Sequence, residues 1–262
     1  MEQVVENKMG TAPMLKLIVT MSLPAMFSML VQALYNVVDS YFVSQVSENA
    51  LTAVSLAYPV QMLMISVAVG TSIGVNSFIS RKLGEKDQAS ANSAATHSIL
   101  IAVASWLVFA LIGIFASRPF IQCFTDIPEI LEMGTQYLSI CMIFSFGVFV
   151  EINIEKTLQA TGNMIYPMVF QLIGAITNII LDPIMIFGWF GFPQMGVAGA
   201  AIATVIGQIF SMLFAAYIIA FKDHDVVISF RKFRINWKII GSIYAVGVPS
   251  IVMQSIGSVM NV

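Results

Sequence analysis

Two acidic residues lie inside long apolar stretches of the chain. Asp39 falls within the run 15–43, and Asp182 falls within the run 164–189. A carboxylate inside a lipid bilayer is costly unless it is paired or hydrated, and acids at such positions usually mark a path for ions, protons or substrate. The two residues therefore indicate an ion-coupled membrane transporter.

Each acid belongs to a stripe of polar side chains on its own helix, because residues three or four positions apart share one helix face. The first stripe consists of Ser28, Gln32, Asn36 and Asp39, and the second of Gln171, Asn178 and Asp182. At 1.5 Å per residue, Asp182 lies about 10 Å below Trp189, and Asp39 lies about 6–8 Å below Val43. Both acids are thus expected in the outer third of the bilayer, close enough to meet.

Two acids in a dry pocket do not both ionise comfortably, so such a pair holds a shared proton or a monovalent cation. Pro183 follows Asp182 directly, and Pro24 precedes Asp39 on the first helix. A proline removes one helical hydrogen bond, so both helices are expected to bend there and expose a carbonyl to a cation or water. Two alternatives stay open. The acids could face lipid headgroups, and Pro24 could reflect only the general frequency of proline in membrane helices.

Composition places these residues in a membrane protein. Hydrophobic residues make up 58% of the 262 residues and charged residues only 10%, against about one quarter charged in soluble domains. Runs long enough to cross a bilayer, without the alternation of barrel strands, predict an all-α polytopic fold. The predicted spans are 14–43, 50–80, 91–117, 131–158, 164–190 and 196–221. A charged loop, 222–236, separates them from the start of a seventh helix at 237–262.

The basic residues predict the orientation. With the N-terminus in the cytoplasm, eleven of the twelve Lys and Arg residues lie on the cytoplasmic side and only Arg118 lies outside. We therefore expect a multi-pass protein of the cell membrane with no cleaved signal peptide. The basic loop residues Arg231, Lys232 and Arg234 indicate topology and contact with anionic lipid, not nucleic-acid binding. Cys123 and Cys141 lack the spacing of a disulfide or metal motif.

Other candidates are weaker. Glu151 and Glu155 lie one turn apart beside Lys156 near the inner end of the fourth span, where a solvated helix end with a local ion pair is favoured over a cytoplasm-facing relay. His97 is interpreted as structural or interfacial, and His224 as solvated. The small residues at 70, 74, 199, 203 and 207 have the spacing of close helix packing.

A weak internal repeat suggests two related halves. Pro24 and Asn36 lie twelve residues apart, and Pro249 and Asn261 repeat that spacing. Secondary transporters are commonly built from weakly similar repeats of this kind. A counterpart of Asp39 would fall two positions past residue 262.

The stretches 23–60, 70–91, 158–188 and 196–208 resemble the multidrug and toxic compound extrusion (MATE) family, of the superfamily that includes lipid-linked flippases. The most specific feature is Asn-x-x-x-Asp-Pro at 178–183 followed by GVAGAAIAT at 196–204. The resemblance implies the six-helix N-lobe of a twelve-helix transporter, of which the second lobe is missing beyond its first helix. It also implies alternating access and export of organic cations or amphipathic drugs in exchange for Na⁺ or H⁺, with no cofactor besides the coupling ion.

Carried over by position, the resemblance to the DinF-like branch implies a cation site formed by Asp39, Asn178, Asp182 and Thr204. Glu155 stands where relatives can carry a neutral Asn. Gln32 and Asn36 of the stripe, together with Glu155, are expected as supporting residues.

Three rival functions remain. A lipid-linked oligosaccharide flippase needs cationic residues in its cavity for a pyrophosphate, and the spans contain almost none. An intramembrane aspartyl protease uses two facing acids and motifs such as GxGD, which is absent. A passive channel or structural subunit differs from an antiporter in its response to an imposed Na⁺ or pH gradient.

Overall fold

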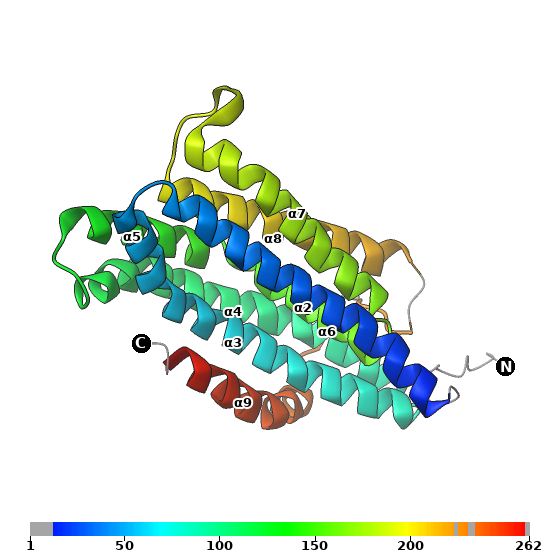
Figure 1. Cartoon of the computed structure of the whole chain (residues 1–262). Coiled ribbons are helices and arrows are strands. Elements are labelled where there is room, and N and C mark those ends of the chain that lie inside the picture. The colour runs from blue at the N-terminus through cyan, green and yellow to red at the C-terminus, as the bar shows by residue number, and fades with distance from the viewer. Residues whose placement is uncertain (1–12, 223–224, 230–233, 260–262) are drawn as a thin grey trace.

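The computed structural model describes residues 13–222, 225–229 and 234–259, and within these ranges all regular structure is helical. This confirms the predicted all-α class. The elements in chain order are α2 (Met14–Ser44), α3 (Glu48–Gly84), α4 (Gln88–Gln122), α5 (Pro128–Ile143), α6 (Phe146–Ala160), α7 (Ile165–Phe187), the 3₁₀ helix η1 (Trp189–Gly191), α8 (Val197–Phe221) and α9 (Trp237–Val259). They form one elongated bundle of antiparallel helices (Figure 1).

Six of these helices are long and apolar enough to cross a membrane: α2, α3, α4, α7, α8 and α9. The structure differs from the single span predicted at 131–158, where α5 and α6 meet at a bend of 46°. At the break, the Ser145 hydroxyl donates to the carbonyl of Met142 at 2.8 Å. A Cβ placed on Gly147 would lie 3.1 Å from the backbone carbon of Gln208 on α8. The bend thus lies next to a close approach between the backbones of α6 and α8.

Helix α6 runs through the middle of the bundle, and most of its residues are buried. It packs against α3, α4, α7 and α8. Polar residues on α6 are therefore surrounded by protein and must find partners on those neighbours.

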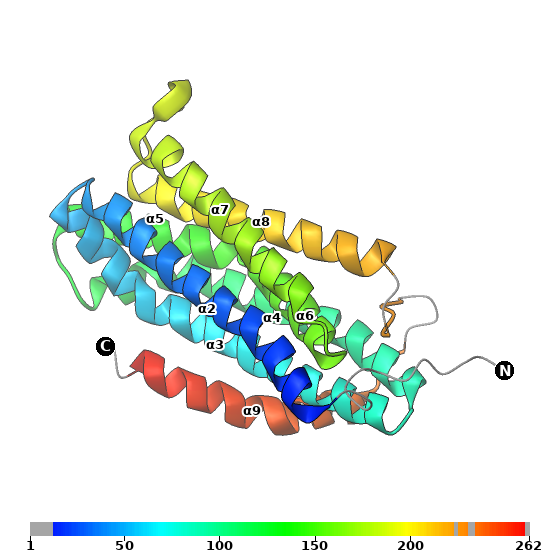
Figure 2. The same cartoon turned by 45° about the vertical axis from the view of Figure 1, so that its right-hand side comes forward.

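The small residues predicted to allow close packing do so at two helix contacts. On α8, a Cβ added to Gly199 would lie 2.5 Å from the carbonyl oxygen of Met185 on α7. On α3, a Cβ added to Gly74 would lie 2.1 Å from the carbonyl oxygen of Ile243 on α9. Helix α9 accordingly lies along α3 on one flank of the bundle (Figures 1 and 2).

Helix α2 packs mainly against α7 and leaves most of its surface exposed, with only Ser28 and Val43 fully buried along it. Figure 2 shows α2 running along α7. The side of α2 that meets α7 carries Asp39, so this helix contact positions the first acid. Of the repeat noted in the sequence, Pro249 lies within α9, and Asn261 lies outside the described residues, as does His224.

Candidate cation site

The two acids come together from neighbouring helices. Asp182 on α7 is fully buried, Asn178 one turn earlier is 2% exposed, and Thr204 on α8 is 6% exposed. Asp39 on α2 is partly buried, and its carboxyl group is in hydrogen-bonding contact with that of Asp182. The packing of α2 and α8 on α7 thus gathers the four residues expected in the cation site.

Hydrogen bonding fixes the orientation of the Asn178 amide. With its nitrogen toward Asp182, Asn178 donates to Asp182 Oδ2 at 2.8 Å. Its oxygen then accepts from the Thr204 backbone N–H at 3.0 Å and from the Thr204 hydroxyl at 3.2 Å. The opposite orientation would place the amide oxygen against the Asp182 carboxylate, where two acceptors repel each other. Asn178 therefore connects Thr204 to the buried acid.

Tyr35 extends this chain of hydrogen bonds, and sequence reasoning missed it. Its hydroxyl lies 3.4 Å from Thr204 Oγ1. Because the Thr204 hydroxyl hydrogen points to Asn178, the hydrogen between Tyr35 and Thr204 comes from Tyr35. The donors thus run in one direction, from Tyr35 through Thr204 and Asn178 to Asp182. Tyr35 lies four residues before Asp39, and that spacing was the available signal.

One acceptor of the site is left without a partner. Asp39 Oδ1 is buried and makes no hydrogen bond within the described residues. Most buried polar atoms in proteins are hydrogen-bonded, so an orphaned carboxylate oxygen calls for an explanation. A bound cation supplies one, because it would be coordinated by that oxygen.

The donor set suits a hard monovalent cation or a proton. The groups that can coordinate an ion present oxygen: two carboxyl groups and the hydroxyl of Thr204, whereas Asn178 turns its amide nitrogen to Asp182. Na⁺ is a hard cation, and such ions take oxygen ligands. Among the described residues no three His, Cys, Asp or Glu side chains gather around one point, so the arrangement offers two carboxylates to an ion here.

Two predicted supporting residues do not join the site. Gln32 and Asn36 are exposed on α2, and the contact to Thr204 comes from Tyr35. Each helical residue is rotated by about 100° from the one before, so Tyr35 faces α8 while Asn36 points aside. Their supporting role stays a prediction. Pro24 and Pro183 lie inside α2 and α7, and their part in helix bending stays a prediction.

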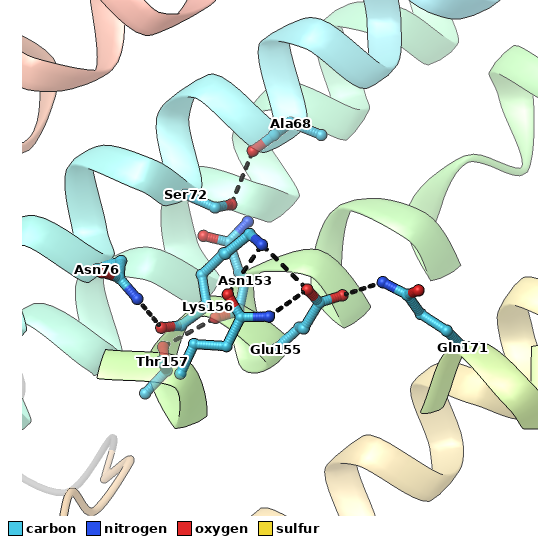
Figure 3. Close-up of polar contacts among 9 residues, drawn as sticks. Ala68, Ser72, Asn76, Asn153, Glu155, Lys156, Thr157 and Gln171 are labelled. Carbon is cyan, nitrogen blue, oxygen red and sulfur yellow. Dashed lines mark hydrogen bonds and ion pairs between the residues drawn. The ribbon is translucent and has the colours of Figure 1, made fainter. Parts of the chain in front are cut away.

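Glu155 also lies outside the site, and the predicted solvated helix end is wrong. Glu151 and Glu155 are 8% and 4% exposed because α6 is enclosed by its neighbours. The local ion pair is present, with Lys156 Nζ 3.0 Å from Glu155 Oε1. Figure 3 shows Gln171 of α7 pointing to Glu155 from the other side, at 3.3 Å.

The chain resembles known transporters along most of its length. It is 29% identical over 257 residues to the multidrug export protein MepA of Staphylococcus aureus, covering 95% of this chain and 56% of that protein. It is 27% identical over 266 residues to an FAD transporter of Shewanella oneidensis, covering 96% and 56%. A multidrug resistance MATE family transporter of the MOP superfamily, solved in an outward-facing conformation, superposes with a TM-score of 0.83 at 31% identity, covering 91% and 52%.

The chain therefore spans about half the length of the relatives it matches. The MatE family model matches residues 24–184, a range that includes both acids of the site. The chain is a multi-pass membrane protein, and it belongs to the MatE family of transporters.

Proposed function

We propose that this chain forms one lobe of a secondary active exporter, and that the Asp39–Asp182 pair binds one cation, with Na⁺ and H⁺ competing for it. The exported compounds are organic cations or amphipathic drugs. The observation that carries the proposal is the buried contact between the two carboxyl groups, in which Asp39 Oδ1 has no partner among the described residues.

The pair can couple ion binding to helix movement because its members lie on different helices. Asp39 is on the weakly packed α2, whereas Asp182 is on α7, which packs tightly against α8. A cation between them draws α2 toward α7, and its loss leaves two like charges that repel each other. Binding shifts the two states only by its differential affinity for them. The bend expected at Pro24 gives α2 a point about which to move.

The orientation is part of the proposal. The described ends of the bundle that carry Lys16, Arg81, Lys82, Lys222 and Lys238 lie together, and Arg118 lies at the opposite end. By the positive-inside rule the first end is cytoplasmic. This orientation places the Asp39–Asp182 pair in the outer half of a cell membrane, where it is reached by ions entering from outside.

Transport in proteoliposomes tests the proposal. The protein expressed from its complete gene is reconstituted into lipid vesicles. Export of a fluorescent organic cation is then followed under an imposed Na⁺ or pH gradient. Asp39→Asn and Asp182→Asn are expected to abolish gradient-driven export and to insert normally. Asp126→Asn is the matched control, because Asp126 is an exposed acid in the loop between α4 and α5. Undiminished gradient-driven export by both site variants would contradict the proposal.

The same assay separates the rival functions. A passive channel would carry the compound down its own gradient whatever ion gradient is imposed. A flippase for an anionic lipid-linked sugar needs cationic residues around its cargo, and the described part of α2 and α7 contains only one Lys, Lys16 at the end of α2. The outer site therefore favours cation-coupled export.

A further inference from the structure

A second polar cluster lies inside the lobe, toward the end that carries the basic residues. Glu151, Glu155 and Lys156 come from α6, Gln171 from α7 and Ser211 from α8. We call these five residues the inner cluster. Gln171 and Asp182 are eleven residues apart on α7, so the inner cluster lies about 16 Å from the cation site along that helix. The two sites are thus separate.

The two contacts of Ser211 point to a hydrogen on Glu151. Ser211 Oγ lies 2.9 Å from Glu151 Oε1 and 2.8 Å from the carbonyl oxygen of Phe170. A serine hydroxyl has one hydrogen and donates one bond at a time, and a carbonyl oxygen can only accept. If Ser211 donates to Phe170, the hydrogen toward Glu151 comes from a protonated carboxyl group. With an ionised Glu151, one of the two short contacts would join two oxygens with no hydrogen between them.

The charges of the cluster lead to the same conclusion. Glu155 Oε1 accepts from Lys156 Nζ at 3.0 Å (Figure 3). Lys156 Nζ also donates to Gln159 Oε1 at 2.9 Å. Lys156 is therefore committed to Glu155. Glu151, 8% exposed, has a hydroxyl as its partner. A protonated Glu151 leaves the buried cluster neutral, whereas an ionised one leaves it with a net negative charge in a membrane-spanning helix.

The neighbouring helices bring no cation to Glu151. On α3, Lys82 pairs with Glu85 at 2.7 Å beyond the helix end. On α4, both ring nitrogens of His97 bond to other groups: Nδ1 to the carbonyl oxygen of Ser93 at 2.7 Å, and Nε2 to the backbone N–H of Asn236 at 2.9 Å. The described part of α8 carries no Asp, Glu, Lys, Arg or His.

Helix α7 faces the inner cluster with the neutral Gln171, and its acid, Asp182, belongs to the cation site. Within the described residues, the charged groups that act on Glu151 are thus Glu155 and Lys156 of its own helix.

We propose that Glu151 is a second proton-binding residue of the lobe, which holds its proton while α6, α7 and α8 are packed together and releases it when water enters between α6 and α8. In the release step the O–H bond of Glu151 breaks and the proton passes to water at the basic end. The cluster changes from neutral to a single negative charge, because Lys156 remains paired with Glu155. This inference does not depend on cation binding at Asp39 and Asp182.

Infrared spectroscopy of the purified protein in lipid nanodiscs tests the proposal. A protonated carboxyl group gives a C=O stretching band distinct from the carboxylate bands. The spectra are recorded in the Asp39→Asn/Asp182→Asn background, so that a proton held by those two acids adds no band of its own. At neutral pH we expect the protonated band in this background, and we expect it to disappear when Glu151→Gln is added. In Ser211→Ala the band should persist but shift, because the carboxyl group loses its hydrogen-bond partner. Glu85→Gln, which removes an exposed acid, should leave the band unchanged.

The outcomes distinguish this proposal from that for the cation site. The Glu151 band should remain in the Asp39→Asn/Asp182→Asn variant, even if that variant shows that the acids bind no cation. Glutamine is the neutral isostere of a protonated glutamate, so Glu151→Gln should keep the thermal unfolding midpoint of the parent protein. The proposal is overturned if Glu151→Gln in the Asp39→Asn/Asp182→Asn background removes carboxylate absorption and leaves the protonated band, or if Glu151→Gln fails to fold.

Discussion

Replacing Thr204 by valine tests the geometry of the cation site with little change of side-chain shape. The substitution removes the hydroxyl that donates to Asn178 at 3.2 Å and that faces Tyr35 at 3.4 Å. The backbone N–H of Thr204 remains and still bonds the Asn178 oxygen at 3.0 Å. Asn178 thus stays oriented toward Asp182, and the loss falls on the hydroxyl alone.

The expected losses of folding stability and of Na⁺ affinity follow from the role of the Thr204 hydroxyl oxygen. Losing one neutral buried hydrogen bond costs about 1 kcal/mol of folding stability. If the same oxygen also binds the cation, a contact to a charged group is lost as well, worth about 1.5–3 kcal/mol. That energy corresponds to a roughly 10- to 150-fold weaker affinity for Na⁺. The Thr204→Ser variant keeps the hydroxyl and is expected to bind Na⁺ nearly as the parent protein does.

Isothermal calorimetry of the purified protein with Na⁺ measures this difference. Thermal unfolding of the same samples shows whether both variants are folded to the same extent. The reasoning is refuted if folded Thr204→Val binds Na⁺ with the same Kd as Thr204→Ser, because the hydroxyl would then lie outside the coordination sphere.

Two further predictions concern the elements that hold the site. Gly199→Ala places a Cβ 2.5 Å from the carbonyl oxygen of Met185 and is expected to cost about 1–3 kcal/mol of folding stability by forcing α7 and α8 apart. A lower midpoint in thermal unfolding checks this. Gly241→Ala is the control, because its Cβ would meet no atom within 4 Å. Ser47→Ala removes the side-chain cap that accepts from the N–H of Ala50 at 3.0 Å and is expected to cost about 1 kcal/mol of folding stability. Amide hydrogen exchange should become faster in the first turn of α3. Unchanged exchange there would show that the cap contributes nothing.

The meeting of the two acids was predictable because both helices carry their own depth markers. Asp39 lies near the C-terminal end of α2 and Asp182 near the C-terminal end of α7, so counting residues from each end places them at similar depth. Which neighbours of Asp39 share its face was harder. Positions three and four residues away both qualify, and only the packing of α2 on α7 and α8 selects Tyr35 over Asn36.

The inner cluster and the broken helix were misread for one physical reason. The sequence of α6 shows two acids and a lysine near a helix end, which is typical of a solvated terminus. Its burial depends on α3, α4, α7 and α8 closing around it, and no local pattern records that. The break at Phe144 and Ser145 contains no proline, and Gly147 just after it packs against the backbone of α8, so the break too lies where a neighbouring helix approaches.

The most direct test of the central claim is the number of Na⁺ ions bound per chain, measured with ²²Na⁺ by equilibrium dialysis over a range of pH. We predict one Na⁺ per chain, displaced as the pH falls, and no binding by Asp39→Asn or Asp182→Asn. Na⁺ binding that is unchanged in both variants, or absent from the parent protein at every pH, would contradict the account.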